Sequence, residues 1–108
     1  MINSKDKQKI EWELNYLLLE AKKRLDEGDK DQAVASFSYV NAIGNAQMAL
    51  NLVKTGVAHD SNPIQSAKSS PYNPFKHDTT YGRKMAYGCI QNAIREIQDL
   101  GFTVQEVL

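Results

Sequence analysis

The spacing of apolar residues predicts three long helices. In the N-terminal part of the chain, apolar side chains recur at i, i+4, i+7 and i+8, with charged side chains between them, as in an amphipathic helix. The longest apolar run covers residues 30–54 and predicts a central helix. A third helix should start with Asp78, Thr79 or Thr80 as its cap and stop at Gly101. The expected core positions of the outer two helices are Ile10, Leu14, Leu17, Leu18, Ala21 and Leu25, then Ala86, Ile90, Ala93, Ile94 and Ile97.

The junction between the first two helices has the residues of a tight turn. Gly28 suits the left-handed residue that follows a helix. Asp29, with Gln32 three residues later, has the spacing of a capping box that starts the next helix. We therefore expect an antiparallel helical hairpin that turns at Gly28 and Asp29.

Residues around this turn resemble one unit of the tetratricopeptide type. They are Ala21, Leu25, Gly28, Asp29, Ala33 and Phe37. The resemblance covers about a quarter of the chain and does not repeat, and the predicted second helix is longer than that of such a unit. We interpret it as shared hairpin chemistry and transfer no binding groove.

Small residues predict where the second and third helices pack. Ala42, Ala46 and Ala49 form a ridge beside Gly44, and the third helix offers a matching ridge of Gly82, Ala86, Cys89 and Ala93. The side chains expected to fill the core around the first ridge are Phe37, Ile43, Leu50 and Val53. Gly44 costs about 1 kcal/mol of helix propensity relative to Ala. A close helix crossing or a bend would explain it, and we favour the crossing.

The segment 57–79 interrupts the helical pattern and contains all three prolines and both histidines. It is too long for an ordinary connection, which indicates a functional, mobile or partly helical loop. Residues 102–108 combine β-branched residues with a capping pattern, so a last helical turn and a short extended segment both stay open. We predict an all-α, up-down-up three-helix bundle, a hairpin plus a third long helix, as one domain over 1–108.

Length, charge and cysteine content narrow the classes of function. A chain of 108 residues suits one domain, and its 13 basic and 13 acidic residues argue against bulk DNA binding. The single cysteine excludes an internal disulfide and a cysteine-based zinc site. No stretch is typical of a secretory signal or a membrane span, so we expect a cytoplasmic protein that does not enter membranes.

One cluster at the start of the third helix predicts an anion site. Thr79 and Thr80 supply hydroxyl groups, and the helix start adds free N–H groups and the positive end of its dipole. Positive charge comes from Arg83 and Lys84. Aromatic rings able to stack on a base are those of Tyr72, Phe75 and Tyr81. These seven residues predict a site for a nucleotide-like ligand; the alternative is a helix cap followed by solvated charges.

Other chemically capable residues give weaker signals. The pairs His59–Asp60 and His77–Asp78 lack the further ligands that a metal site needs, so we interpret them as polar loop residues or helix caps. Cys89 lies on a small-residue face and should be buried filler, not a nucleophile. We expect no metal, no cofactor, no catalytic residue and no enzymatic activity.

A second apolar line on the first helix consists of Trp12, Tyr16 and Leu19. It makes the apolar face wider than one neighbour requires. Either this helix touches two neighbours within the bundle, or the line is an oligomer contact. We expect a homo-oligomer. The basic run 22–24 is expected to be a solvated helix face, too far from the start of the third helix to join its charges.

In general character, this short, charge-balanced helical chain without catalytic motifs resembles accessory proteins encoded by bacterial phages and prophages. The resemblance implies an anti-defence role, either as a sponge for nucleotide signals or as an anti-CRISPR-like inhibitor, and it assigns no residue. Our leading hypothesis is capture of a nucleotide-like ligand at the third helix. One competing hypothesis is a stoichiometric inhibitor or scaffold of another protein, acting through Trp12, Tyr16 and Leu19 or through the loop. The other is an oligomeric interaction module.

Overall fold

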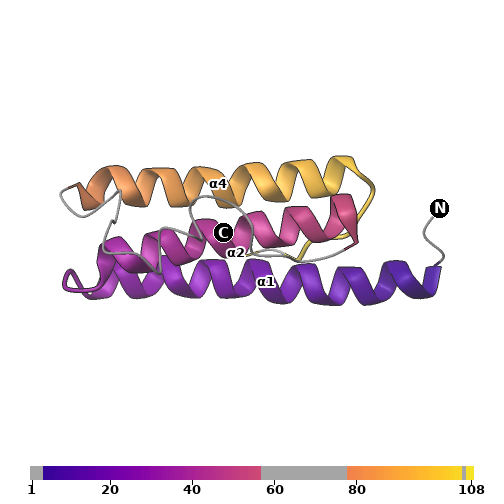
Figure 1. Cartoon of the computed structure of the whole chain (residues 1–108), viewed down its shortest axis with the longest axis horizontal. Coiled ribbons are helices and arrows are strands. Elements are labelled where there is room, and N and C mark those ends of the chain that lie inside the picture. The colour runs from indigo at the N-terminus through magenta and orange to yellow at the C-terminus, as the bar shows by residue number, and fades with distance from the viewer. Residues whose placement is uncertain (1–3, 57–77, 106) are drawn as a thin grey trace.

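The computed structural model is an all-α bundle, as predicted (Figure 1). It describes residues 4–56, 78–105, 107 and 108. Helix α1 spans Ser4–Lys30, α2 spans Ala35–Thr55 and α4 spans Thr79–Asp99. The predicted loop lies outside the described residues up to position 77, and its last predicted residue, Thr79, already belongs to α4.

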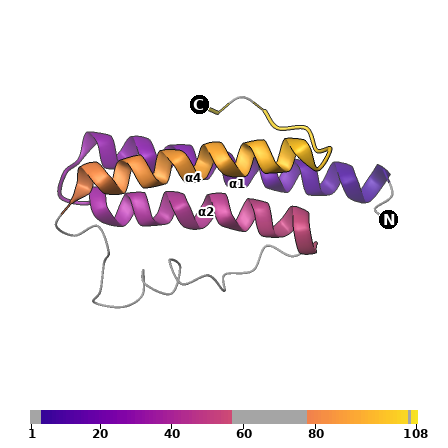
Figure 2. The ribbon, with the colours of Figure 1, turned by 90° about the horizontal axis from the view of Figure 1, so that it is seen from above.

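The predicted up-down-up order of the helices is wrong. Helix α2 runs antiparallel to α1, whereas α4 runs parallel to α2 (Figures 1 and 2). An ion pair of 4.0 Å between Lys54 and Glu96 joins the last turns of α2 and α4, and Arg83 near the start of α4 reaches Asp29 near the end of α1. A third helix that runs up and one that runs down would bury the same apolar stripes. A connection of more than twenty residues is also long enough to span a helix of about 31 Å. Neither the apolar pattern nor the length of the connection therefore excluded either topology.

Helix α2 is the central element, as its long apolar run predicted. It packs against both other helices, which contact each other much less. The predicted core stripes are buried, with Ile10 and Ile94 at their edge. Ala42, Ala46 and Ala49 are fully buried, and Ala86 and Ala93 of the opposing ridge are also buried. Small side chains thus let α4 lie close to α2.

Gly28 does not end a helix, which corrects the predicted turn. Helix α1 continues through it to Lys30, and its backbone does not enter the left-handed region. A Cβ atom at Gly28 would lie 2.6 Å from Cε1 of Tyr39. The glycine is therefore needed for close approach of an aromatic ring from α2. Gly101 does have positive φ, at 93°, where α4 stops as expected.

Asp29 is likewise not the cap of the second helix. The chain turns later, where the Asp31 carboxylate accepts the backbone N–H of Ala33 at 3.0 Å. Helix α2 then begins after Val34, which makes no side-chain cap. The shift also moves the core position: Phe37, predicted to be buried, is 49% exposed, and Tyr39 is buried instead.

The end of the chain is extended along the bundle. Asp78 caps α4 by accepting the N–H of Tyr81 at 2.9 Å, one of the three caps predicted. After Gly101 the described residues of 102–108 form no helical turn and run back beside α1 and α4 (Figure 2). We call this segment the tail. Of the two alternatives left open by the sequence, the extended one is observed.

Candidate functional site

An aromatic stripe on α1 faces solvent. It consists of Trp12, Tyr16 and Leu19, which are 73%, 52% and 52% exposed. Their spacing of four and three residues places them on one helix face. The Trp12 and Tyr16 rings stack with centroids 6.2 Å apart and planes 9° from parallel. Helix α1 does contact both α2 and α4, as one interpretation predicted, but neither helix covers this stripe.

The tail is held beside this stripe by side chains of α1. The Thr103 backbone N–H donates to Glu11 Oε2 at 2.6 Å, and the Gln105 N–H donates to Asn15 Oδ1 at 2.7 Å. Asn15 Nδ2 in turn donates to the Thr103 carbonyl at 3.1 Å. A single amide side chain therefore both donates to and accepts from the tail backbone, as a neighbouring β-strand would.

Stripe and tail together enclose a pocket of about 390 Å³. Trp12, Tyr16 and Leu19 line it from α1, and Thr103 and Gln105 line it from the tail. Glu11 and Asn15 of α1 also line it. Its volume lies within the range of pockets that accept a large side chain or a small ligand.

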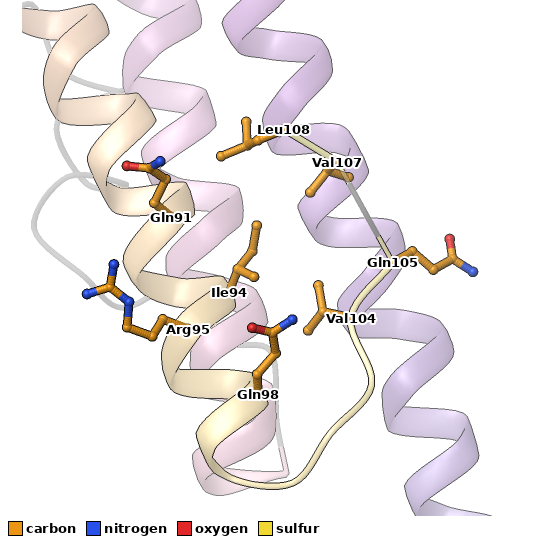
Figure 3. A pocket seen from close by; sticks show the side chains of 8 residues that line it. All are labelled: Gln91, Ile94, Arg95, Gln98, Val104, Gln105, Val107 and Leu108. Carbon is orange, nitrogen blue, oxygen red and sulfur yellow. The ribbon is translucent and has the colours of Figure 1, made fainter.

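A second cavity, of about 400 Å³, lies on the other side of the tail (Figure 3). Its α4 wall carries Gln91, Ile94, Arg95 and Gln98, and its tail wall carries Val104, Gln105, Val107 and Leu108. In Figure 3 the Val104 side chain points toward α4, whereas Gln105 points away from it. The tail therefore divides two hollows of different chemistry, one aromatic and one amphipathic.

The predicted anion cluster is only partly brought together. Thr79, Thr80 and Arg83 line a shallow hollow of about 270 Å³, shared with Asp29, Gln32 and Tyr39. Tyr81 and Lys84 are exposed and do not line it, and Tyr72 and Phe75 lie outside the described residues. The hollow thus combines two hydroxyls and a cation with a carboxylate that no pattern indicated.

This carboxylate joins all three helices. Asp29 Oδ1 accepts the Arg83 Nε–H at 2.9 Å and the Tyr39 hydroxyl at 2.7 Å. Burial and the hydrogen bond to Asp29 raise the pKa of Tyr39 to about 12. Burial alone would raise the pKa of Asp29, but the hydrogen bonds from Arg83 and Tyr39 outweigh it and lower that pKa. The charge of Arg83 is consequently paired within the protein before any ligand arrives.

The remaining candidates serve local structure where they are described. Burial raises the pKa of the Cys89 thiol, which makes the reactive thiolate scarcer. The cations of 22–24 each pair with a carboxylate of α1 itself, at Asp26, Glu20 and Glu27. His59, Asp60 and His77 lie outside the described residues. Within the described ranges, no group of three metal-ligating side chains occurs, and no helix is both long and apolar enough to cross a membrane.

The partners of the tail were missed by reasoning from sequence. Glu11 and Asn15 are ordinary polar positions of an amphipathic helix, and no local pattern marks them as ligands of a segment some ninety residues away. The only feature of the sequence that indicated this site was the excess of apolar residues on α1. No family model, curated protein or solved structure matches the chain.

Proposed function

We propose that the protein is a non-enzymatic module that binds another polypeptide through Trp12, Tyr16 and Leu19. The observation that carries this proposal is Trp12, which is 73% exposed, stacked on Tyr16, and set beside a pocket whose second wall is the docked tail. Tryptophan and tyrosine are the residues most enriched among those that dominate binding energy at protein interfaces.

The energetics favour such a role. Covering the exposed part of a tryptophan side chain contributes about 3 to 4 kcal/mol, from roughly 200 Å² of ring surface and about 25 cal/mol per Å². Ring stacking and the hydrogen bonds of Asn15 already hold the stripe and the tail in place. Little conformational entropy would then be lost on binding, since the surface is preorganised.

The general resemblance to phage accessory proteins makes a stoichiometric inhibitor of a host protein the form of this function that we favour. A rigid bundle presenting one aromatic surface suits that task because it needs no catalytic group. Association of two copies through the same stripe is the other form, and it would be isologous.

Affinity capture with matched variants tests the proposal. Wild type, Trp12→Ala and Phe37→Ala would be immobilised and exposed to an extract of the cells that produce the protein. Phe37 is the control because it is an exposed aromatic residue on another helix. We expect wild type and Phe37→Ala to retain one polypeptide in stoichiometric amount. Trp12→Ala should bind that polypeptide at least about 30-fold more weakly.

Two results would contradict the proposal. One is equal retention of the captured protein by all three variants. The other is the absence of any captured protein together with a monomeric mass for the wild type in native mass spectrometry. A dimer that dissociates in Trp12→Ala would support the proposal in its homo-oligomeric form.

A nucleotide-like ligand at Thr79, Thr80 and Arg83 is the second candidate, favoured by their shared hollow beside a helix start. An anion there would have to compete with Asp29 for Arg83. Thermal unfolding in the presence of a nucleotide panel tests it: a rise in Tm for wild type that is absent in Arg83→Ala supports this site. An unmoved wild-type Tm across the panel refutes it.

A further inference from the structure

We infer that the pocket between the aromatic stripe and the tail receives an arginine side chain of the bound polypeptide. The guanidinium group of this arginine would lie on the rings of Trp12 and Tyr16 and pair with the carboxylate of Glu11. This inference rests on the proposed function and names the residue type of the partner that the surface recognises.

The first support is the charge of the pocket. Of the described residues that line it, only Glu11 is charged. Its Oε2 accepts the Thr103 N–H at 2.6 Å, which fixes the carboxylate beside the tail. Glu11 forms no ion pair with any residue of the described ranges, and the ammonium group of Lys7, one helical turn away, lies over the Phe102 ring instead. A partner that covers the pocket removes water from this carboxylate, so it must supply a cation in return.

The second support is the pair of aromatic rings that line the same pocket. Trp12 stacks on Tyr16 and is still 73% exposed, so its ring is open to a ligand. The face of an aromatic ring carries negative charge density and attracts cations, most strongly in tryptophan. An apolar side chain of the partner would cover the rings but leave Glu11 unpaired, and an acidic one would be repelled by Glu11. A basic side chain satisfies both the rings and the carboxylate.

The third support is the set of hydrogen-bond acceptors, which favours arginine over lysine. Besides Glu11, the side-chain hydroxyl of Thr103 and the side-chain amide of Gln105 line the pocket. A guanidinium group is planar, stacks on aromatic rings and carries five N–H donors along its edge. It can therefore lie on a ring face and donate to these acceptors at the same time. The ammonium group of lysine is compact and strongly hydrated, and it has only three donors.

Selection from a display library of short random peptides against the full-length protein supplies the probe. Enriched peptides should share an arginine beside large apolar residues. One enriched peptide would be synthesised with arginine, lysine or citrulline at that position, because citrulline has nearly the shape of arginine but no charge. Calorimetric titration into the wild type should show the highest affinity for arginine and the lowest for citrulline. The loss from arginine to citrulline should be about tenfold.

The decisive comparison among protein variants is Glu11→Gln against Glu13→Gln. Both remove one negative charge from α1, but only Glu11 lines the pocket. Glutamine at position 11 keeps an oxygen that can accept the Thr103 N–H, and an unchanged exchange rate of the Gln105 amide would show that the tail is still docked. The arginine peptide should bind Glu11→Gln about tenfold more weakly than Glu13→Gln. The advantage of arginine over citrulline should shrink in Glu11→Gln and persist in Glu13→Gln.

The outcomes separate this inference from the proposed function. Equal affinity of the arginine and citrulline peptides for wild type, with binding lost in Trp12→Ala, overturns the arginine and leaves the aromatic surface standing. Equal affinity of the arginine peptide for Glu11→Gln and Glu13→Gln also overturns it. A peptide that binds Trp12→Ala as tightly as wild type contradicts both proposals. A selection that enriches no arginine-containing peptide overturns the inference, and so does a wild-type dimer that the arginine peptide fails to dissociate, since a second copy would then cover the surface.

Discussion

Replacing Gly28 by alanine should destabilise the protein, although alanine is the better helix former. Gly28 lies inside α1, so its replacement contributes about 1 kcal/mol in helix propensity. The new Cβ, however, would lie 2.6 Å from Cε1 and 3.0 Å from Cζ of Tyr39, far inside ordinary van der Waals contact. Tyr39 is 3% exposed and its hydroxyl donates to Asp29, so moving the ring would disturb both its packing and this hydrogen bond.

The magnitude follows from these opposing terms. Overpacking a core costs about 1 to 3 kcal/mol, and weakening a hydrogen bond to a charged group costs about 1.5 to 3 kcal/mol. After the gain in helix propensity is subtracted, the net loss in the free energy of unfolding should be about 2 kcal/mol. For a domain of this size it corresponds to a fall in Tm of roughly 10 °C.

Gly88→Ala is the matched control. Gly88 also lies inside a helix, α4, but nothing lies within 4 Å of the Cβ position there. Urea unfolding followed by circular dichroism should show Gly88→Ala gaining up to about 1 kcal/mol while Gly28→Ala loses stability. In a Tyr39→Ala background, Gly28→Ala should cease to destabilise. A single Gly28→Ala variant at least as stable as wild type would refute the reasoning.

Three further predictions concern Tyr39, the tail and the aromatic stripe. Folding raises the pKa of Tyr39 from 10.0 to about 12. The contribution of Tyr39 to stability is therefore present below pH 10 and is lost as the pH rises toward 12. Urea midpoints measured across this pH range should fall less steeply in Tyr39→Phe than in wild type. Asn15→Ala should release the tail, seen as faster hydrogen exchange of the Gln105 amide; an unchanged exchange rate would contradict the hydrogen bonds assigned to Asn15. Trp12→Ala should change the free energy of unfolding by no more than about 0.5 kcal/mol, whereas Leu14→Ala should cost about 2 to 5 kcal/mol; chemical denaturation compares the two, and a large loss in Trp12→Ala would show that the stripe is part of the core.

The helices and their buried faces follow from local pattern, whereas their junctions do not. The stripe from Leu14 to Leu25 is predictable because its spacing matches one helix face. Gly28 and Asp29 look like a helix stop because each has that local preference, yet both lie within α1. Contacts with Tyr39, ten or more residues away, decide their conformation. Such contacts depend on three-dimensional packing that residue spacing does not encode.

The candidate site was likewise predictable only in part from the sequence. The apolar excess at Trp12, Tyr16 and Leu19 is visible in the sequence, but periodicity cannot distinguish a face that meets a second helix from one that meets solvent. The position of α4 decides that question, because α4 packs mainly against α2 and contacts α1 much less. Docking of the tail on Asn15 could not be predicted, because the sequence around Asn15 does not indicate which backbone groups its side chain will bind.

The tail also orders the events of folding. Helices α1 and α2 are neighbours in the chain and can associate through short loop closure, whereas Asn15 and Gln105 are 90 residues apart. The contacts of the tail with Asn15 therefore require loop closure over a much longer stretch of chain than the association of α1 with α2. A chain without a docked tail would expose the aromatic rings with only one side of the pocket formed, so the partner we propose should bind it more weakly.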